Sequence, residues 1–254
     1  MPPGTLHLLP APLDFGTAAP LPPLADTIGA QALRVAARLE HWVVENAKSA
    51  RAVLIRVNAV VPLARPLQEL SIVALPRAPK AADRSVDRPA WEALLAPALA
   101  GHDLGLMSEA GLPGLADPGA ALVALAHERG VTVRVHAGPS SIALALAASG
   151  LNGQSFAFVG YVPTDPAERG ARLRELERRA RREAQTQIVI ETPYRNAALM
   201  QALLAALQAD TLLSVSVGLT LPDGWSRTSR VEHWIRKTTA LPADQPAVFC
   251  IGGP

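Results

Sequence analysis

The sequence predicts a two-domain α/β protein, with a mainly parallel sheet in the N-terminal domain and a mixed sheet in the C-terminal domain. Its 254 residues are enough for two domains of roughly 100–150 residues each. A short buried strand is expected over 104–107 and a second strand over 131–135, and a small-residue loop and a helix follow each of them. Two successive strand–loop–helix units are typical of a parallel sheet with right-handed crossovers. We place the domain boundary near residue 150, giving domains over 1–150 and 151–254.

The composition suits two such domains and excludes other classes of protein. Hydrophobic residues make up 49% of the chain and aromatic residues only 4%, so the core must be built from Ala, Leu and Val. Charged residues make up 18%, which is too few for a disordered chain. The formal net charge of +2 does not by itself predict nucleic-acid binding.

Nothing in the sequence predicts secretion or insertion into a membrane. No apolar run reaches the roughly 18 residues that span a bilayer, and the N-terminus lacks a basic segment followed by an apolar one. Cys250 is the only cysteine, so neither a disulfide nor a cysteine-based zinc site can form within one chain. We therefore expect a cytoplasmic protein without a metal site.

Prolines and apolar spacing divide the first half of the chain into its expected elements. Pro10 and Pro12 end a first strand over 5–9, and a proline-rich loop follows over 10–23. Apolar residues at helical spacing then predict a helix over 23–38. Further along we expect strands over 41–45 and 70–75 and helices over 46–55 and 91–100.

The pattern changes character after residue 153. A helix over 142–148 precedes this change, and a strongly charged helix is expected over 168–183. Strands are expected over 156–161, 187–190, 213–217 and 248–251, with a further helix over 196–207.

A loop of small residues, 108–114 (SEAGLPG), follows one of the expected parallel strands. Open α/β sheets bind ligands at the carboxyl ends of their strands, where glycines let the backbone approach closely. Small side chains leave room for a flat group such as adenine, and Glu109 could accept hydrogen bonds from hydroxyl or amino groups. The alternative is an ordinary turn that leads through Pro118, in the first helical turn, into a helix over 119–129.

A second tight loop, 137–141 (AGPSS), has the same place after the next strand. Ser140 or Ser141 can cap the following helix, whose free N–H groups could bind a carboxylate. The alternative, a cap and nothing more, is the simpler interpretation of this segment alone. His136 could line a site here, although a single histidine beside a strand is more often structural.

Several familiar chemistries are excluded by the spacing of residues. Gly111, Gly114 and Gly119 do not have the spacing of a dinucleotide fingerprint, and neither a phosphate-binding P-loop nor a nucleophile elbow occurs. The six histidines form no pair with glutamate of the kind that binds catalytic zinc.

The segment 168–183 contains seven arginines and four glutamates. Arginine forks suit phosphate groups, which would favour RNA binding. The alternative is a solvated helix with ion pairs such as Glu168–Arg172, Glu175–Arg179 and Glu177–Arg181. We favour the solvated helix, because the glutamates neutralise more than half of the charge.

Five ordered segments resemble a known family. They are 108–119 (SEAGLPGLADPG), 137–141 (AGPSS), 148–151 (ASGL), 158–163 (FVGYVP) and 191–195 (ETPYR). Together they resemble the tetrapyrrole methylase superfamily, and within it the ribosomal RNA small subunit methyltransferase I branch, which methylates a ribose 2′-hydroxyl. The resemblance covers most of 4–217 and is weakest over 56–90 and after 218.

The resemblance implies a two-domain fold, a homodimer, and S-adenosylmethionine held between the domains. Carried over by matching position, cofactor contacts would come from four segments of this chain. They are Pro10, Pro12 and Leu13; Ser108, Glu109, Ala110 and Gly111; Ser140 and Ser141; and Glu191, Thr192 and Pro193.

The chain departs from the branch at two places on the substrate side. Where the branch has T-P-I-G-N-L-x-D after the first strand, this chain has P-A-P-L-D-F-G over 10–16. Where it has the acidic motif E-D-T-R-x-T, this chain keeps Glu45 and has Asn46 in place of the aspartate. A divergent paralogue with a different acceptor would show this combination.

Transfer of a methyl group to a ribose hydroxyl would benefit from a general base. Glu45 is our candidate, with Asn46 orienting the acceptor and Lys48 or Arg51 binding a phosphate. Three hypotheses remain open: an RNA ribose methyltransferase, a methyltransferase acting on a small molecule or another acceptor, and a non-catalytic protein that still binds adenosylmethionine.

Overall fold

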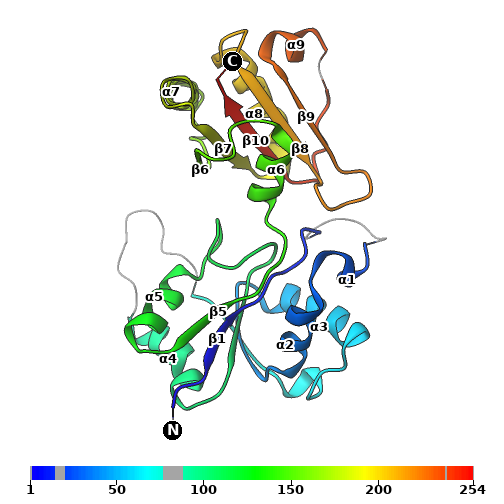
Figure 1. Ribbon diagram of the computed structural model, residues 1–254, viewed down its shortest axis with the longest axis vertical. Helices are drawn as coiled ribbons and strands as arrows, with labels where there is room; N and C mark the ends of the chain where they lie inside the picture. Colours follow the sequence, from blue (N-terminus) through cyan, green and yellow to red (C-terminus); the bar gives the residue numbers. More distant parts are fainter. Residues whose placement is uncertain (1, 15–20, 77–87, 238, 254) are drawn as a thin grey trace. The chain divides into compact units, whose positions relative to one another are not determined.

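The computed structural model describes residues 2–14, 21–76, 88–237 and 239–253, and these form two compact units. Apart from Leu21, the described residues up to Pro139 belong to the first unit and those from Ser140 onward to the second. Each unit contains one five-stranded sheet (Figure 1). The expected loop over 10–23, including Phe15 and Gly16, and the segment 56–90 lie partly outside the described residues.

The sheet of the first unit is entirely parallel, with the strand order β3-β2-β4-β1-β5. Its central strands are short and apolar, as expected of strands covered on both faces. Because the strands are parallel, their carboxyl ends lie along one edge. The strands are β1 (Thr5–Leu8), β2 (His41–Val44), β3 (Ser71–Ala74), β4 (Leu104–Met107) and β5 (Thr132–Val135).

Helices cover both faces of this sheet and bury two separate cores. Trp42 and Val44 pack among α2 and α3 on one face, whereas Leu6 and Val43 pack among α4 and α5 on the other. Alternate side chains of β2 therefore enter opposite cores, as the period of a strand requires. The helices are α1 (Leu24–Thr27), α2 (Ala30–Arg38), α3 (Ala47–Val60), α4 (Arg88–Leu99) and α5 (Ala120–Glu128).

The sheet of the second unit is mixed, with the order β6-β7-β10-β8-β9. Strands β6 and β7 are parallel, and the other neighbours are antiparallel. The strands are β6 (Phe156–Gly160), β7 (Thr186–Glu191), β8 (Leu212–Val217), β9 (Trp225–Arg230) and β10 (Ala247–Gly252).

Helix α6 (Ser141–Ser149) covers one face of the mixed sheet, where Ile142 and Leu146 pack on Ile188 and Val248. The other face is covered by α7 (Pro166–Glu183), α8 (Asn196–Ala206) and α9 (Val231–Arg236). Since α6 packs on this sheet, it is grouped with the second unit, and the division lies between Pro139 and Ser140.

The fold class predicted from the sequence is confirmed, and most strands and helices differ by only a few residues at their ends. The helix expected over 23–38 is two helices, because the chain is extended at Ile28 and Gly29. Helix α5 begins only at Ala120, because Gly119 has a φ of 128°, so Pro118 precedes the helix instead of opening it.

Helix α9 and strand β9 were not predicted. Strand β9 (WSRTSR) is a polar edge strand whose residues are half-buried or exposed, so it lacks the apolar alternation of a covered strand. None of the helices in the described part of the chain combines the length and the apolar composition needed to cross a membrane.

Candidate active site

The carboxyl ends of β1, β2 and β4 meet at one edge of the first sheet, because these strands are parallel neighbours. The backbone ladder continues past the strands: Leu9 N donates to Leu106 O at 2.9 Å, and Glu45 N donates to Met107 O at 3.1 Å. The first residues of three loops are therefore held together. These loops carry most of the site residues that the sequence predicts for the first unit.

Glu45 and Glu109, which follow β2 and β4, are joined by a direct hydrogen bond. The backbone N–H of Glu109 donates to Oε2 of Glu45 at 3.0 Å, and the Ser49 hydroxyl donates to Oε1 of Glu109 at 3.0 Å. Burial raises the pKa of the half-buried Glu45; the hydrogen bond from Glu109 opposes this rise, and the charge of Glu109 adds to it. A carboxylate with a raised pKa is a better proton acceptor near neutral pH.

A third acid, Asp117, interacts electrostatically with both glutamates, and the sequence analysis missed it. Burial and then the charge of Glu45 raise the pKa of Asp117 to about 6; the polar hydroxyl of Ser108 opposes the rise, and the charge of Glu109 adds to it. The preceding Ala116 has a φ of 68°, a left-handed conformation that is uncommon for a residue with a side chain. The only signal in the sequence was an aspartate within the loop, directly before Pro118.

The first turns of α3 place the other predicted substrate-side residues. Asn46 is the N-cap of α3, and its Oδ1 accepts a hydrogen bond from Lys48 N at 2.8 Å. Lys48 and Arg51 are exposed, and Arg51 Nη1 donates to Ala47 O at 3.4 Å within the helix. The amide oxygen of Asn46 therefore has a structural partner, and its Nδ2 group is the part that could meet an acceptor.

Two of the predicted cofactor loops are tied directly to each other. Ala11 and Gly111 exchange backbone hydrogen bonds of 2.9 and 3.0 Å, which joins the segment after β1 to the segment after β4. Pro10 and Pro12 are buried beside this bridge. Ser108 is also buried, and its hydroxyl donates to Ala110 O at 3.1 Å, which closes the turn at the end of β4.

The third loop, 137–139, approaches both of the others through glycine. A Cβ atom on Gly138 would lie 2.2 Å from Cβ of Pro10, so only glycine permits this approach. A Cβ on Gly111, whose φ is 71°, would lie 3.4 Å from Leu13 Cδ2 and 3.5 Å from Pro139 O. A cradle of backbone and small side chains of this kind fits a nucleoside, because atoms of a flat group can lie directly on it.

Arg56 of α3 fixes the loop that follows β1. Its Nη1 donates to Oδ2 of the buried Asp14 at 2.8 Å, and its Nη2 donates to Pro22 O at 3.0 Å. The guanidinium therefore holds two points of the loop at once. The sequence analysis assigned no role to either charged residue.

In the second unit, the predicted serines begin α6. The Ser140 hydroxyl accepts from Ala143 N at 3.5 Å, and Ser141 is the first residue of the helix. The capping interpretation of this loop is therefore confirmed, and contact with a cofactor stays a prediction.

The other predicted segment of the second unit follows β7. Oε1 of the buried Glu191 accepts hydrogen bonds from Thr192 N at 2.8 Å, from the Thr192 hydroxyl at 3.2 Å and from Arg195 Nη2 at 2.7 Å. Pro193 begins a single 3₁₀ turn that leads into α8. The Glu191 carboxylate thus has structural partners, and it holds this turn in shape.

Asn196, the first residue of α8, directly follows this turn. Asn196 is 1% exposed, and its Nδ2 donates to Gln245 O at 2.9 Å. Its Oδ1, and also Oγ1 of Thr220 beyond β8, have no hydrogen-bond partner among the described residues. A buried acceptor and a buried hydroxyl without partners suit a ligand that carries amino and hydroxyl groups, as S-adenosylmethionine does.

Comparison with known proteins identifies the family to which the chain belongs. Residues 30–232 match the family model described as Tetrapyrrole (Corrin/Porphyrin) Methylases. Two curated relatives are both named Ribosomal RNA small subunit methyltransferase I. The protein of Vibrio cholerae is 34% identical over 48% of this chain and 41% of its own length, and that of Mesorhizobium japonicum is 33% identical over 63% of this chain and 53% of its own. The matched regions thus span only about half of those relatives.

A solved structure shares the fold of the whole chain. It is the uroporphyrin-III C-methyl transferase of Thermus thermophilus, complexed with S-adenyl homocysteine, the demethylated form of the cofactor. The TM-score is 0.54 at 18% identity, over 98% of this chain and 97% of that one. At this identity the likeness establishes the fold alone. On the match to the family model, this chain belongs to the tetrapyrrole methylase family, whose members are S-adenosylmethionine-dependent methyltransferases.

Proposed function

We propose that this protein transfers a methyl group from S-adenosylmethionine to a ribose 2′-hydroxyl of ribosomal RNA. The observation that carries the proposal is Glu45: a half-buried carboxylate with a raised pKa at the carboxyl end of a central strand, held in place by Glu109 N. The names of the relatives from Vibrio cholerae and Mesorhizobium japonicum support the choice of ribosomal RNA.

The proposed cofactor contacts are made by the backbone of the first unit. The bridge between Ala11 and Gly111 and the approach of Gly138 to Pro10 provide a close-fitting surface for the nucleoside. Asn196 and Thr220 of the second unit offer polar atoms without partners among the described residues. When bound, S-adenosylmethionine supplies a methyl group on a positively charged sulfur, which is reactive toward an oxygen nucleophile.

The chain's own residues would then act on the acceptor. The Glu45 carboxylate accepts the proton of the 2′-hydroxyl as the oxygen attacks the methyl carbon. The Asn46 Nδ2 group orients the ribose, and the exposed Lys48 and Arg51 bind neighbouring phosphates. The Glu109 N–H holds Oε2 of Glu45, which leaves the other carboxylate oxygen for the proton.

The test replaces Glu45 by Gln, which keeps an acceptor for Glu109 N but removes the basic oxygen. The assay follows radiolabelled methyl transfer to small-subunit ribosomal RNA transcribed in vitro, which carries no modifications. We expect Glu45→Gln to lower kcat by about 10²–10⁴-fold while the affinity for S-adenosylmethionine is retained. Glu69→Gln, at an exposed glutamate in the 3₁₀ turn before β3, is the matched control and should have wild-type activity.

The methyl product can be identified by its chemistry. A 2′-O-methylated nucleotide resists alkaline hydrolysis, whereas methylation of a base does not protect the backbone. Full turnover by Glu45→Gln would overturn the assignment of the base. Methylation of a nucleobase would contradict the proposal that the ribose 2′-hydroxyl is the acceptor. An enzyme that binds the cofactor but transfers no methyl group to RNA would contradict it too.

A different acceptor is a second candidate, favoured by one observation. Asn46 stands where the related branch has an aspartate, and its amide oxygen caps α3. Aspartate and asparagine both cap helices, so the exchange keeps the cap and removes a negative charge from the site. A site without this charge fits an acceptor with different polar groups. Label appearing in small molecules of a cell extract, and not in RNA, would support this candidate; binding of S-adenosylmethionine by calorimetry without transfer to any acceptor would leave only the non-catalytic role.

Two further parts of the proposal concern assembly and location. A homodimer follows from the resemblance to the family, and light scattering of the purified protein would test it. A cytoplasmic location is supported by the single cysteine, Cys250, which is buried. Fractionation of cells with an antibody to the protein would test the location.

A further inference from the structure

We propose that three exposed arginines on α7, Arg174, Arg178 and Arg182, form a stripe that binds the phosphate backbone of RNA. The inference rests on the proposed function, because it assigns a second contact to the same RNA. It reverses the interpretation favoured from the sequence, in which this helix is merely solvated. The reversal comes from how the charges of α7 are distributed between its two faces.

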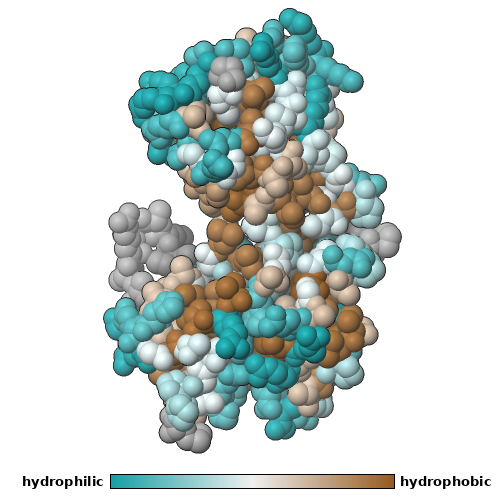
Figure 2. Space-filling model, in the orientation of Figure 1, coloured by the Kyte–Doolittle hydropathy of each residue, from teal (hydrophilic) through white to brown (hydrophobic). Residues whose placement is uncertain are grey.

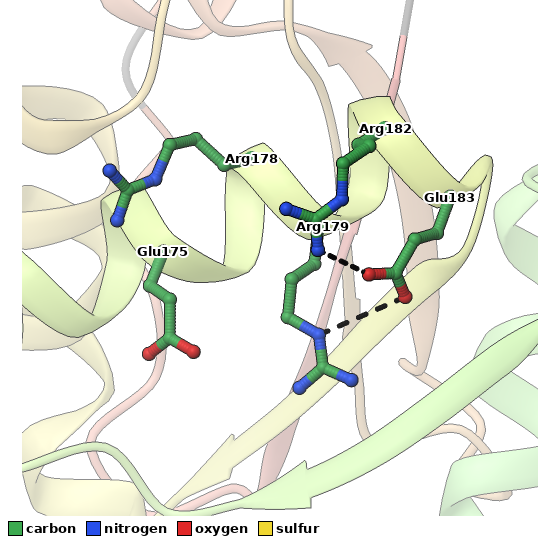
Figure 3. Close-up of a pocket in the computed structure, with 5 residues that line it drawn as sticks. All are labelled: Glu175, Arg178, Arg179, Arg182 and Glu183. Carbon is green, nitrogen blue, oxygen red and sulfur yellow. Dashed lines mark hydrogen bonds and ion pairs between the residues drawn. The ribbon is translucent and has the colours of Figure 1, made fainter.

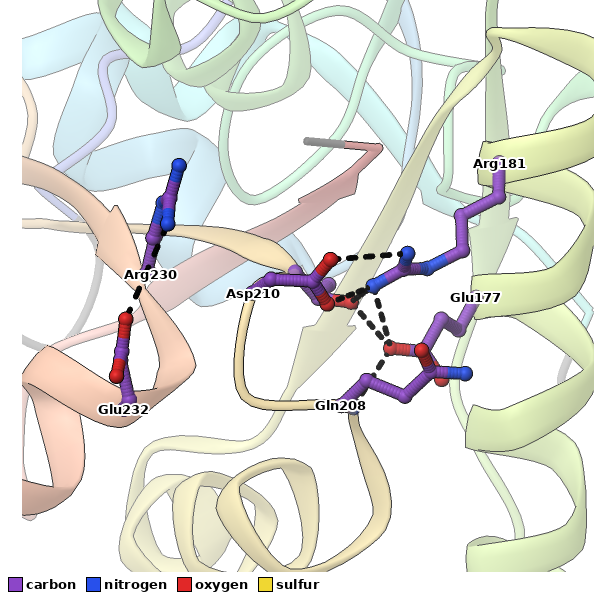
Figure 4. Close-up of polar contacts among 7 residues, drawn as sticks. Glu177, Arg181, Gln208, Asp210, Arg230 and Glu232 are labelled. Carbon is purple, nitrogen blue, oxygen red and sulfur yellow. Dashed lines mark hydrogen bonds and ion pairs between the residues drawn. The ribbon is translucent and has the colours of Figure 1, made fainter.

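The inward charges of α7 have structural partners. Glu177 is 3% exposed; its Oε1 accepts from Gln208 N at 2.8 Å and also from the Thr211 hydroxyl. Arg181 pairs with Asp210 on the same side (Figure 4). These contacts anchor α7 to the loop before β8, so neither side chain is available to a ligand.

The outward charges are only partly paired, and the pairs differ from those expected. Arg172 pairs with Glu175 at 2.6 Å instead of with Glu168, and Glu183 pairs with Arg182 at 2.6 Å and with Arg179 at 3.9 Å. Of the expected pairs, Glu177–Arg181 is formed at 3.9 Å. Arg174 and Arg178 make no ion pair within the described part of the chain.

The spacing of these arginines suits a linear polyanion. Arg174, Arg178 and Arg182 are separated by four residues each, so they follow one face of the helix at intervals of roughly 6 Å. All three are exposed, and the exposed Ala171, one turn before Arg174, adds a small side chain at that end of the row. Arg178 and Arg182 also line a surface hollow with Arg179, Glu175 and Glu183 (Figure 3).

The net charge of the protein is concentrated on this helix. Helix α7 carries seven arginines and four glutamates, a net charge of +3, whereas the complete chain has a formal net charge of +2. The remainder of the chain is therefore close to neutral. Figure 2 shows hydrophilic side chains gathered over α7, at the upper left of the view. Such a cationic surface attracts nucleic acid and releases its counterions.

The test is the affinity for a short fluorescein-labelled single-stranded RNA, measured by anisotropy over a range of salt concentrations. We expect Arg174→Gln/Arg178→Gln/Arg182→Gln to weaken binding roughly tenfold or more and to reduce the slope of log K against log [salt] by about 2. The control removes the same charge from exposed arginines elsewhere: Arg65→Gln/Arg88→Gln/Arg236→Gln. Both variants should keep the wild-type melting temperature and affinity for S-adenosylmethionine.

Equal losses in the two triple variants would overturn the stripe, because the effect would then follow net charge alone. Competition by poly-L-glutamate as strong as that by unlabelled RNA would also overturn it, in favour of an acidic protein partner. The inference and the proposed function can fail separately. If the wild type methylates RNA but the stripe variant keeps the wild-type slope of log K against log [salt], only the stripe is rejected. If the stripe variant lowers that slope but the wild type transfers no methyl group to RNA, only the proposed function is rejected.

Discussion

His7 Nδ1 and His136 Nε2 lie 3.0 Å apart in the interior of the first unit, one on β1 and the other just after β5. Both side chains are buried, and Arg38 Nη2 lies 3.2 Å from Nε2 of His7. Asp103 is 3.4 Å from the same nitrogen and also pairs with Arg38. One ring nitrogen of the pair must donate and the other accept, so the contact requires at least one neutral histidine.

This pair predicts that stability falls in mild acid. Burial lowers the pKa of His7, although the charge of Asp103 opposes this change. The pKa of His136 is lowered by burial and by the charges of His7, Arg134 and Arg38. Because the unfolded chain then binds more protons than the folded one, stability is complete above the unfolded pKa of about 6.5 and is lost as the pH falls below it. The measurement is the free energy of unfolding in denaturant at about pH 7.5 and about pH 5.5.

His136→Gln tests the origin of that loss, because its amide can replace Nε2 without titrating. We expect the variant to lose less stability than the wild type between the two pH values. Glu45 and Asp117, whose pKa values are raised, act in the opposite direction in both proteins and cancel in the comparison. His233→Gln, at a histidine that is 51% exposed, is the control, and an equal change in all three proteins would contradict the assignment.

The approach of Gly138 to Pro10 predicts a strong steric effect. In Gly138→Ala the new Cβ would lie 2.2 Å from a proline ring on buried backbone, so the loop must move. We expect a loss of about 1–3 kcal/mol in the free energy of unfolding and a weaker affinity for S-adenosylmethionine. Gly153→Ala is the control, because nothing lies within 4 Å of the position of its Cβ. Wild-type stability and affinity in Gly138→Ala would show that the two loops do not pack as described.

The fold could be predicted because its strongest signals are local. Apolar strands followed by small-residue loops and helices predicted β4, α5, β5 and α6 nearly at their observed bounds. Strand β9 could not be found this way, because it owes its place to hydrogen bonds with β8 and not to its own apolar pattern. The two prolines after β1 were enough to end that strand.

The candidate site was predictable only where residues stand at the ends of strands. Glu45 and Glu109 follow β2 and β4, so parallel pairing alone brings them together. Asp117 could not be placed, because it returns to them only through the left-handed turns at Gly114 and Ala116. Ser49 was missed for a different reason: it lies in the first turn of α3 and not directly after a strand, and its hydroxyl donates to Glu109, which follows the neighbouring strand β4.

The raised pKa of Asp117 predicts that removing its charge makes the protein more stable but less active. A carboxyl whose pKa is raised to about 6 in the folded state destabilises it increasingly as the pH rises from the unfolded value toward 6. Asp117→Asn removes this charge, so we expect it to stabilise the protein on the order of 1 kcal/mol at neutral pH after solvent screening is considered.

The same variant should transfer methyl groups more slowly, because the acceptor site loses a titratable carboxyl group that interacts with Glu45. Unfolding in denaturant and the RNA methylation assay measure the two effects on one preparation. The difference in stability should vanish in strong acid, where Asp117 of the wild type is protonated in both states. A variant that is destabilised at neutral pH would show that Asp117 is held as a favourable carboxylate.

The two contacts of the Arg56 guanidinium lead us to expect that a lysine, which keeps the positive charge, will not replace this arginine. Arg56 donates separately to the buried Asp14 and to Pro22 O, whereas a lysine presents a single ammonium group that cannot reproduce the fork. We expect Arg56→Lys to lower the free energy of unfolding by about 1–3 kcal/mol and to weaken S-adenosylmethionine binding, since one of the two contacts that Arg56 makes with the loop after β1 is lost. Arg65→Lys, in an exposed pair with Glu40, should change neither quantity measurably. If calorimetry gave the same cofactor affinity for both variants, the loop after β1 would not depend on this contact to bind the cofactor.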